Sequence, residues 1–338
     1  MSAIGLEVMG IRADPDLEKS MRVGLASVEE LLRGSVRSEF SFVTEASRHL
    51  VDAGGKRFRP MVVLLAAQFA DPDAAGVVPA AVAIELTHLS TLYHDDVMDE
   101  APLRRGAASA NARWTNTVAI LTGDFLFARA SEITADLGPE ATRILARTIA
   151  TLCEGQIRET VGVGPGQDPI EHYLRVITEK TASLIATSAR LGAMLAGADP
   201  VTTDILAAFG ERFGVAFQLS DDLIDVASPS EDSGKTPGTD LREGIPTLPV
   251  LYALQGEDAA ARRLRDLLGA NPRTGAGVTE SGVVEALELL REHPAMGRAR
   301  AELIRWSSEA RECLAPLPDG SAKTALESLA DFVIDRTS

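Results

Sequence analysis

The amino-acid sequence predicts an all-α protein. Apolar residues recur three and four positions apart along most of the 338-residue chain, which is the period of an amphipathic helix. Aromatic residues make up only 4% of the sequence, and the apolar content is mostly Ala, Leu, Val and Ile, a balance that favours helices packed through small side chains. Strand-like runs bounded by turn residues are scarce. With 45% hydrophobic residues, the chain can bury a substantial core as one large domain or two.

Charge and cysteine content narrow the class of protein. The formal net charge of −16 argues against a nucleic-acid-binding surface, which would concentrate Lys and Arg. No stretch has the basic start and apolar core of a secretion signal, and none approaches the ~18 apolar residues of a membrane span. Cys153 and Cys313 lack CxxC spacing, so neither a zinc site nor a disulfide framework is indicated. We therefore expect a cytoplasmic protein without a transmembrane segment.

Helices are expected between breaks rich in Gly, Pro and Asp. In chain order, residues 1–20 should form an N-terminal tail, breaks fall at 164–169, 197–200 and 228–244, and peripheral helices follow from 256 to 338. The break at 228–244 is long enough to be a functional loop.

The clearest helix covers residues 203–226. Three phenylalanines, from Phe209 to Phe217, follow each other at intervals of four, and the same stripe continues to Asp221 and Asp225. We therefore expect these two aspartates on the buried face of the helix.

Six aspartates form two similar clusters. The stretch "YHDDVMDE" and the later stretch "FQLSDDLIDV" each follow an apolar run, and together they contain Asp95, Asp96, Asp99, Asp221, Asp222 and Asp225. Residues four apart share a helical face, so the outer aspartates of each cluster point together. Inward carboxylates need protonation, basic partners or divalent cations.

Magnesium fits these clusters best among the cations. It prefers hard oxygen ligands, takes one or two protein carboxylates, keeps several waters and binds substrate phosphate. One cluster alone would equally fit a solvated acidic helix face, but two copies favour a metal site. A calcium loop would need a twelve-residue ligand order with a central Gly, which neither cluster has.

Two basic segments could hold phosphate groups. "GGKRFRP", residues 54–60, combines a Gly pair with Lys56, Arg57 and Arg59, and "LRRG" contributes Arg104 and Arg105 directly after the first aspartate cluster. Arginine can grip phosphate through paired donors. The Gly pair is not a Walker loop, because the GxxxxGK[ST] spacing is missing. Two basic groups suggest two anionic ligands.

These segments together resemble the all-trans polyprenyl diphosphate synthases. The resemblance runs in order through "GGKRFRP", "IELTHLSTLYHDDVMDEAPLRRG", "LTGDFLFARA", "KTASL", "FQLSDDLIDV", "GKTPGTDLREG" and "TLPVLYAL". It implies one polyprenyl synthase domain over residues 1–338, with the clear match at about 45–255. It also implies a single large helical bundle, usually a homodimer, whose two aspartate motifs face each other across a central cavity.

The resemblance further implies a magnesium-dependent prenyltransferase of isoprenoid biosynthesis. Such an enzyme extends an allylic diphosphate by isopentenyl diphosphate and releases pyrophosphate. The implied magnesium ligands are Asp95, Asp99 and Asp221, while Asp96, Asp222 and Asp225 complete the clusters and Lys180 joins them as a catalytic residue. The implied contacts to the allylic diphosphate or its metals are Arg104, Lys180, Thr181, Gln218 and Lys235. Those to isopentenyl diphosphate are Lys56, Arg59, His88 and Arg105.

One position departs from the family pattern. In "REGIPTLP", Ile245 stands where many relatives carry Lys. The lysine that would contact phosphate in those relatives is replaced here, and Lys235 could supply the needed charge alone. We interpret Ile245 as a variation in affinity.

Residues one and two turns before Asp95 bear on product length. Thr87, Ser90 and Thr91 are all small and lie on the face that the growing hydrocarbon must pass. In relatives that stop at farnesyl or geranylgeranyl length, a bulky aromatic commonly occupies a position matching Ser90 or Thr91. We therefore expect a long-chain product, with geranylgeranyl as the shorter alternative.

Two other functions remain open from the residues. A class I terpene cyclase would share the first aspartate motif, but it binds one diphosphate and usually carries an Asn/Ser/Glu second motif. A non-catalytic subunit of a heteromeric prenyl synthase could keep the fold, but such subunits tend to lose the aspartates. The second "DDLID" motif and the "GGKRFRP" segment favour the synthase.

Overall fold

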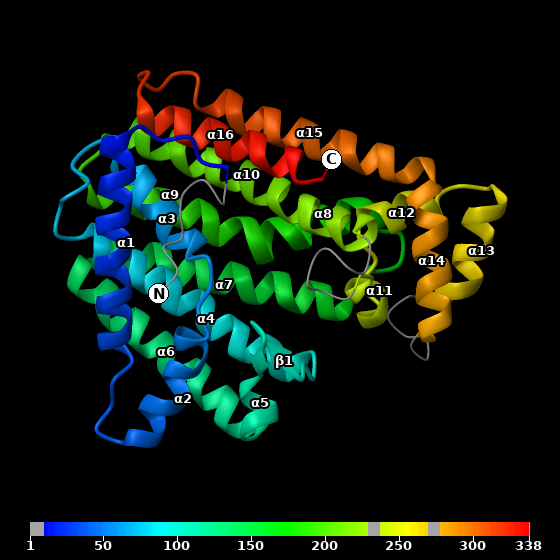
Figure 1. The fold of residues 1–338 in the computed structure, drawn as a ribbon, viewed down its shortest axis with the longest axis horizontal. Helices are drawn as coiled ribbons and strands as arrows, with labels where there is room; N and C mark the ends of the chain where they lie inside the picture. Colours follow the sequence, from blue (N-terminus) through cyan, green and yellow to red (C-terminus); the bar gives the residue numbers. More distant parts are fainter. Residues whose placement is uncertain (1–9, 229–236, 270–277, 338) are drawn as a thin grey trace. The chain divides into compact units, whose positions relative to one another are not determined.

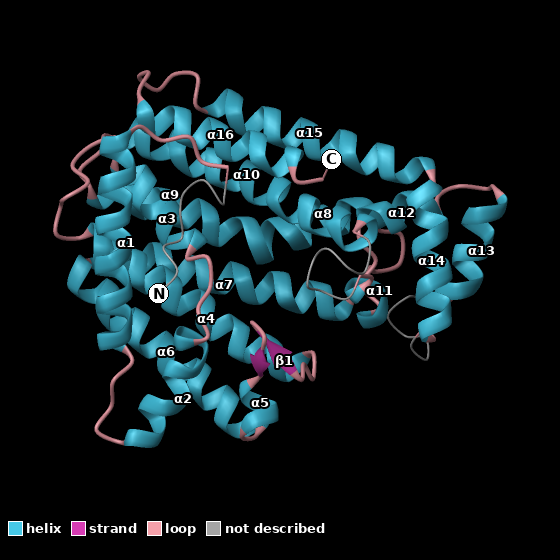
Figure 2. Ribbon diagram, viewed as in Figure 1, coloured by secondary structure: helices cyan, strands magenta, loops and turns pink. Residues whose placement is uncertain are grey.

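The computed structural model describes residues 10–228, 237–269 and 278–337, and these are almost entirely helical (Figures 1 and 2). In chain order the elements are α1 Pro15–Ser35, α2 Ser41–Asp52, α3 Phe58–Ala67, α4 Val77–Met98, β1 Leu103–Arg104, β2 Ala107–Ala108, α5 Ala110–Arg113, α6 Asn116–Leu137, α7 Pro139–Val161, α8 Pro169–Ile177, the π-helical turn η2 Thr178–Ala182, α9 Ser183–Leu195, α10 Pro200–Ala227, α11 Thr239–Glu243, α12 Leu248–Leu254, α13 Ala259–Leu268, α14 Glu280–Glu292, α15 Pro294–Cys313 and α16 Ser321–Asp335. The all-α prediction is confirmed.

Several helix starts follow directly from the sequence. Asp14 accepts a hydrogen bond from the backbone N–H of Leu17 and is followed by Pro15, so α1 has both an N-cap and a favourable first residue. Asp168 caps α8 in the same way, and Thr115 caps α6. Helix α1 therefore begins at Pro15, inside the stretch expected to be an N-terminal tail.

The described chain divides into two compact units. Unit 1 contains the residues up to Thr151, Ser183–Gly210 and Cys313–Ser328, and unit 2 contains Leu152–Ala182, Glu211–Glu312 and the residues from Leu329 onward. The prediction of a single domain around a central cavity stays a prediction.

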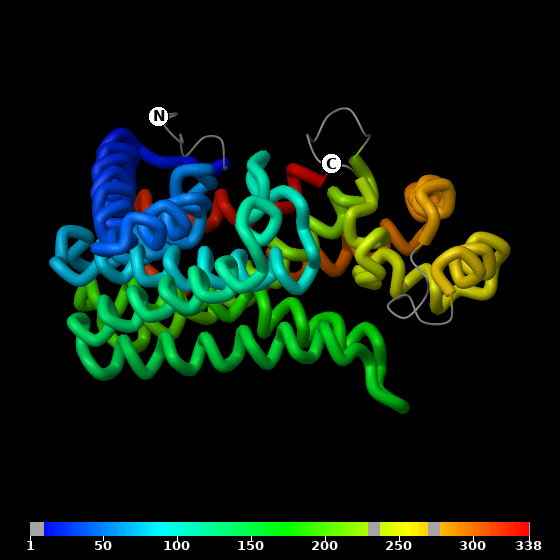
Figure 3. The backbone as a smooth tube through the Cα atoms, turned by 90° about the horizontal axis from the view of Figure 1, so that it is seen from below, coloured from blue at the N-terminus to red at the C-terminus, as the bar shows by residue number. Residues whose placement is uncertain are grey.

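Helix α4 is the centre of unit 1. It packs against α1, α3, α6 and α9, and Figures 1 and 3 both show α6 beside it. Its buried side chains lie all round the helix, as expected for a core helix. Helices α3 and α9 approach closely, because a Cβ on Gly192 would lie 2.2 Å from the Val63 carbonyl oxygen. This packing fixes the helix that carries the first aspartate cluster.

Unit 2 holds the second half of α10. Phe213 is fully buried there, whereas Asp221 keeps 41% of its side chain exposed. The expectation that Asp221 and Asp225 lie on the buried face is wrong, because Asp222 is the buried member, with 4% exposed. Steps of four residues advance about 40° around a helix, so a stripe that starts at Phe209 has turned by about 120° at Asp221.

None of the described helices is long and apolar enough to cross a membrane. The two short strands are the only ones among the described residues, and they form one antiparallel hairpin. That hairpin directly follows the first aspartate cluster.

Candidate active site

The first aspartate cluster occupies the end of α4. Asp95 is half-buried, and Asp99 is the exposed C-cap residue, whose N–H donates to the Asp95 carbonyl oxygen over 2.8 Å. Asp96 is fully buried, and its Oδ1 accepts a hydrogen bond from Arg104 Nε at 2.6 Å. Burial raises the pKa of Asp96, while the Arg104 charge opposes this shift. Asp96 therefore anchors Arg104, and of the other two aspartates in the cluster Asp99 is the more exposed.

The hairpin after α4 presents the two arginines of "LRRG". Leu103 pairs with Ala108 and Arg104 with Ala107, so Arg105 and Gly106 form a two-residue turn. Both turn residues have positive φ, 54° and 76°, as a type I′ turn requires. An arginine in this conformation is strained, and such strain is often found at functional sites.

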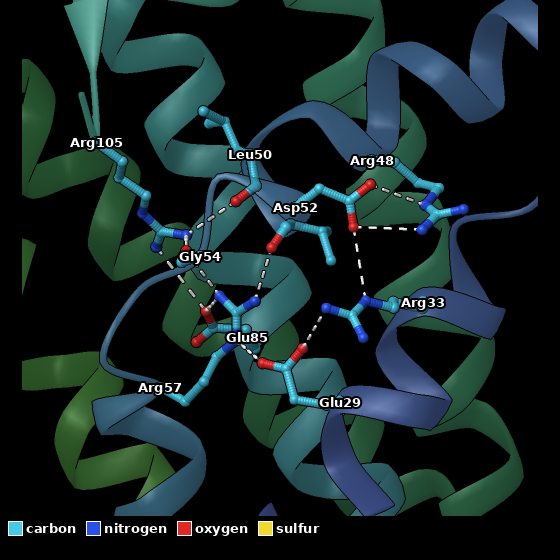
Figure 4. Close-up of polar contacts among 10 residues, drawn as sticks. Glu29, Arg33, Arg48, Leu50, Asp52, Gly54, Arg57, Glu85 and Arg105 are labelled. Atoms are coloured by element: carbon cyan, nitrogen blue, oxygen red, sulfur yellow. Dashed lines mark hydrogen bonds and ion pairs between the residues drawn. The ribbon is translucent and has the colours of Figure 1, made fainter. Parts of the chain in front are cut away.

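The "GGKRFRP" segment connects α2 to α3. Arg57, the residue before α3, also has positive φ, 47°. Its side chain is 2% exposed, whereas Lys56 is exposed and Arg59 is half-buried in the first turn of α3. Figure 4 shows that the Arg57 side chain turns inward, toward Glu85 and Glu29. Lys56 and Arg59, the two residues of this segment predicted to bind diphosphate, thus lie on either side of Arg57, whose side chain is buried and paired within the protein.

His88 lies two turns before Asp95 on α4. Burial and the charges of Arg59, Arg105, Arg104 and Arg57 lower the pKa of His88 well below its usual value. The imidazole is therefore neutral near pH 7. The charges of arginines from both basic segments thus act on His88, which is itself a predicted isopentenyl diphosphate contact.

The second cluster is organised around Asp222. Its carboxylate accepts hydrogen bonds from the Tyr173 hydroxyl and from Gln218 Nε2, the latter at 2.9 Å. Gln218 Oε1 in turn accepts from Thr181 Oγ1 at 3.0 Å. Burial raises the pKa of Asp222 to about 7. Thr181 and Gln218, both predicted site residues, are thus linked to Asp222.

Lys180 and Thr181 belong to the π-helical turn η2. Such turns interrupt α-helices rarely and frequently at functional sites. Helix α7 packs closely against this turn at Gly155, because a Cβ added there would lie 2.8 Å from the Lys180 backbone nitrogen. The Lys180 ammonium lies 2.6 Å from Glu159 Oε2. The protein thus supplies a carboxylate partner for the predicted catalytic lysine.

Asp225 accepts hydrogen bonds from the first residues of α11. Its Oδ1 accepts from the Thr239 backbone N–H at 3.1 Å, and its Oδ2 from that of Asp240 at 3.3 Å. Burial, together with the nearby Asp222 and Asp225 charges, raises the pKa of Asp240 to about 9. Asp240 was not singled out from the sequence, although it lies in the quoted "GKTPGTDLREG". Lys235 lies outside the described residues.

Asp221 has a partner that the sequence did not reveal. Arg336 Nη1 lies 2.9 Å from Asp221 Oδ1, and the same guanidinium donates to Ser220 Oγ at 2.7 Å and to the Phe217 carbonyl oxygen at 2.9 Å. The C-terminal segment, expected to be peripheral, thus reaches the second cluster. No local spacing could have indicated this contact.

The three residues predicted to control product length differ in exposure. Thr87 and Ser90 are fully buried. Thr87 Oγ1 donates to the Ala83 carbonyl oxygen at 2.8 Å, and Ser90 Oγ donates to that of Gly123 on α6 at 2.7 Å. Only Thr91 of the three keeps exposed surface. Among them, Thr91 is therefore the one that an additional molecule could contact without disturbing helix packing.

The carboxylates suit magnesium but do not form a closed metal cage. Among the described residues, no three or more His, Cys, Asp and Glu side chains converge as a metal site. Asp95, Asp99 and Asp221 offer hard oxygen atoms near solvent, which fits an ion that keeps waters and binds substrate phosphate. Asp96 Oδ2 is buried without a hydrogen-bond partner among the described residues. The donor set thus fits magnesium held by few protein ligands.

Comparison with known proteins gives one consistent result. The polyprenyl synthetase family profile matches residues 41–283. The chain is 49% identical over 318 residues to the nonaprenyl diphosphate synthase of Mycobacterium tuberculosis, covering 94% of this chain and 93% of that protein. It is 42% identical to component 2 of the heptaprenyl diphosphate synthase of Geobacillus stearothermophilus, covering 91% and 94%.

A solved structure extends the match to the fold. The geranylgeranyl pyrophosphate synthase of Corynebacterium glutamicum, crystallised with calcium and isoprenyl diphosphate, is 46% identical, with a TM-score of 0.85 and coverage of 97% of this chain and 99% of that one. The shared fold and sequence extend well beyond the segments that carry the motifs. This chain belongs to the polyprenyl synthetase family.

Proposed function

We propose that the protein is a trans-prenyltransferase that joins an allylic diphosphate to isopentenyl diphosphate and releases pyrophosphate. Its product is a geranylgeranyl or longer polyprenyl diphosphate. The main support is one arrangement in unit 1, where a single helix, α4, carries the first aspartate cluster at its end and, two turns earlier, His88, whose pKa is lowered by burial and by the charges of four arginines. The residues proposed to bind the metal and a residue proposed to bind a diphosphate thus lie on the same helix.

The described contacts support a division of roles among the predicted residues. In this proposal Asp95, Asp99 and Asp221 hold magnesium. Asp96, Asp222 and Asp225 support the site through their hydrogen bonds to Arg104, to Tyr173 and to the backbone of Thr239. The allylic diphosphate is bound by Arg104, Lys180, Thr181, Gln218 and Lys235. Isopentenyl diphosphate is bound by Lys56, Arg59, His88 and Arg105.

The reaction chemistry matches these roles. Bound magnesium supplies positive charge that stabilises the departing pyrophosphate. Arg104 and Lys180 are cations proposed to bind the allylic diphosphate, and each is held by a carboxylate of its own unit. The double bond of isopentenyl diphosphate then attacks the allylic carbocation, and the departing pyrophosphate takes up the proton whose loss restores a double bond. The basic residues around His88 orient that second substrate.

Two further proposals concern assembly and location. We propose a homodimer that works in the cytoplasm, as the family resemblance implies. Helix α6 offers an apolar surface for a second copy, since Ile120 is 43% and Leu121 62% exposed. Gel filtration with light scattering tests the assembly, and cell fractionation tests the location.

One incubation tests the proposed reaction. The protein is mixed with magnesium, farnesyl diphosphate and labelled isopentenyl diphosphate, and the products are dephosphorylated and separated by chain length. We expect labelled prenyl alcohols of geranylgeranyl length or longer, and none when EDTA replaces magnesium. A terpene cyclase would instead form hydrocarbons from farnesyl diphosphate without consuming the label. A non-catalytic subunit would leave both substrates unchanged.

A further inference from the structure

Glu85 is a buried carboxylate that the proposed reaction leaves without a role. It lies on α4, and only 2% of its side chain is exposed. Burying a charged group costs free energy unless it is paired and hydrogen-bonded. Glu85 Oε1 lies 3.0 Å from Arg57 Nη1 and 3.9 Å from Arg105 Nη2. One carboxylate oxygen is thus shared by two arginines from different segments (Figure 4).

Arg57 is held on every side. Besides Glu85, its guanidinium donates to Glu29 Oε1 at 2.5 Å, to the Val51 carbonyl oxygen at 2.9 Å and to that of Gly54 at 3.1 Å. The last two acceptors lie where α2 ends and the "GGKRFRP" segment begins. The Arg57 side chain therefore folds this segment back on itself.

Arg105 meets the same segment from the hairpin side. Its Nη1 donates to the Leu50 carbonyl oxygen at 3.0 Å and also to that of Gly54. A Cβ on Gly55 would lie 2.8 Å from the Arg105 guanidinium carbon. Glycine is needed there for this contact, so the hairpin turn and the basic segment are fitted together at Gly54 and Gly55.

Glu85 is the principal electrostatic partner of both guanidiniums. Burial opposes the charge of each one, and Glu85 is the largest opposing influence in both cases. The net pKa of Arg57 is raised, because Glu29 assists, and that of Arg105 is lowered. The Arg57 charge also lowers the pKa of Arg105, so without the Glu85 charge this repulsion between the two guanidiniums would lose its main compensation.

The geometry points to Glu85 as a positioning residue for the isopentenyl diphosphate site. By holding Arg57 and Arg105 through one oxygen, it fixes the "GGKRFRP" segment against the hairpin turn and thereby sets the positions of Lys56 and Arg59. This inference rests on the proposed function, which assigns those two cations to isopentenyl diphosphate. It predicts an effect on one substrate and little effect on the other.

The test compares Glu85→Gln with the wild-type enzyme. The amide keeps the size of the side chain but removes its charge. We expect the KM for isopentenyl diphosphate to rise tenfold or more. The KM for farnesyl diphosphate should change by less than threefold, and the helical circular-dichroism signal should not change. Glu85→Asp restores the charge at a shorter reach and should recover part of the affinity. A general loss of stability would affect both substrates alike.

Glu29→Gln is the matched control. Glu29 also pairs with Arg57, at 2.5 Å, but its side chain is 23% exposed, and its second ion pair among the described residues is with Arg33 instead of Arg105. If the affinity for isopentenyl diphosphate depends on one carboxylate that pairs with both Arg57 and Arg105, Glu29→Gln should change the KM for this substrate by less than threefold. Equal effects of the two amide variants, or an unchanged KM in Glu85→Gln, would overturn the inference.

Calorimetric titration with isopentenyl diphosphate alone separates this inference from the proposed reaction. If wild type binds the diphosphate tightly and Glu85→Gln binds it weakly, the positioning role stands even if no condensation is observed. If Glu85→Gln does not fold, the double variant Glu85→Met, Arg57→Met removes both buried charges, a change that proteins often tolerate. This double variant should fold and should bind isopentenyl diphosphate as weakly as we expect of Glu85→Gln. Binding by the double variant with wild-type affinity would refute the inference.

Discussion

Arg336 Nη1 lies 2.9 Å from Oδ1 of Asp221, so a residue near the chain's C-terminal end neutralises a predicted metal ligand in unit 2. A carboxylate paired with a guanidinium binds a divalent cation less readily, because the fixed positive charge opposes the ion. The other bonds of Arg336, to Ser220 and Phe217, hold its guanidinium at this place. We therefore expect the magnesium affinity of the proposed site to depend on the C-terminal segment.

We expect Arg336→Gln to lower the magnesium concentration needed for half-maximal activity by threefold or more. Glutamine can still hydrogen-bond, but it carries no charge to compete with the ion. The measurement is a magnesium titration of the initial rate at saturating substrates. Arg311→Gln, which removes an ion pair with Asp331, serves as the control. A higher magnesium requirement in Arg336→Gln would mean that Arg336 supports the metal site.

The aspartates should separate into ligands and anchors. Asp95→Asn and Asp221→Asn are each expected to reduce turnover by two or more orders of magnitude, because a metal ligand is lost. Asp225→Asn should retain more turnover, since its oxygen can still accept from the α11 backbone. Steady-state rates at saturating magnesium decide this. The division into ligands and anchors fails if all three variants lose the same factor.

The two diphosphate sites should respond to different cations. Lys56→Ala and Arg59→Ala should raise the KM for isopentenyl diphosphate most, and Lys180→Gln that for the allylic substrate, because each removes a charge-assisted contact. We expect changes of tenfold or more in the affected constant. Each variant needs two titrations, one per substrate. Parallel changes in both constants for every variant would contradict the assignment.

His88 should make the protein sensitive to mild acid. Its folded-state pKa lies well below 6.5, through burial and the charges of Arg59, Arg105, Arg104 and Arg57, whereas in the unfolded chain it titrates near ~6.5. Below that pH the unfolded chain binds a proton that the folded protein does not. The free energy of unfolding then falls by at most ~1.4 kcal/mol per pH unit for this group.

Urea unfolding at pH 7.5 and 5.5 measures this contribution. His88→Gln lacks the titrating group, so it should lose less stability between the two pH values than the wild type. His49→Gln, which changes a histidine with an exposed hydrogen bond to Ala108, is the control. An equal loss in wild type and His88→Gln would show that the imidazole accepts its proton freely in the folded protein.

Much of this fold could be predicted because its signals are local. Helix periodicity, N-caps such as Asp14 and the order of short motifs all lie within a few residues of each other. The same is true of the aspartate clusters and the basic segments. A resemblance built on such segments correctly indicated the family.

The remaining features depend on long-range packing. Arg336 and Asp221 are far apart in sequence, and no spacing relates them. In the sequence, Glu85 is a single acidic residue in an apolar helix, and only the structure shows its two arginine partners. Asp222 is buried in place of Asp221 because positions four residues apart drift by about 40° per step around a helix. A stripe of residues at intervals of four therefore leaves the buried face after a few steps.

Product length should be controlled by Thr91 and not by Ser90. Both precede Asp95 by about one turn, but Ser90 is fully buried and donates to the Gly123 carbonyl oxygen, whereas Thr91 keeps exposed surface. A phenylalanine at Ser90 would have to displace α6, and overpacking of this kind typically costs 1–3 kcal/mol. Thr91 is only half-buried, so a ring at this position has less packing to displace.

We therefore expect Thr91→Phe to shorten the product by one or more five-carbon units while leaving the KM values of both diphosphates within threefold. Ser90→Phe should instead lower the melting temperature, with no comparable shortening. Chromatography of the dephosphorylated products, together with thermal unfolding of each variant, measures both effects. Shortening by Ser90→Phe in a protein of normal stability would place the limiting wall at Ser90, on the side of α4 that packs against α6.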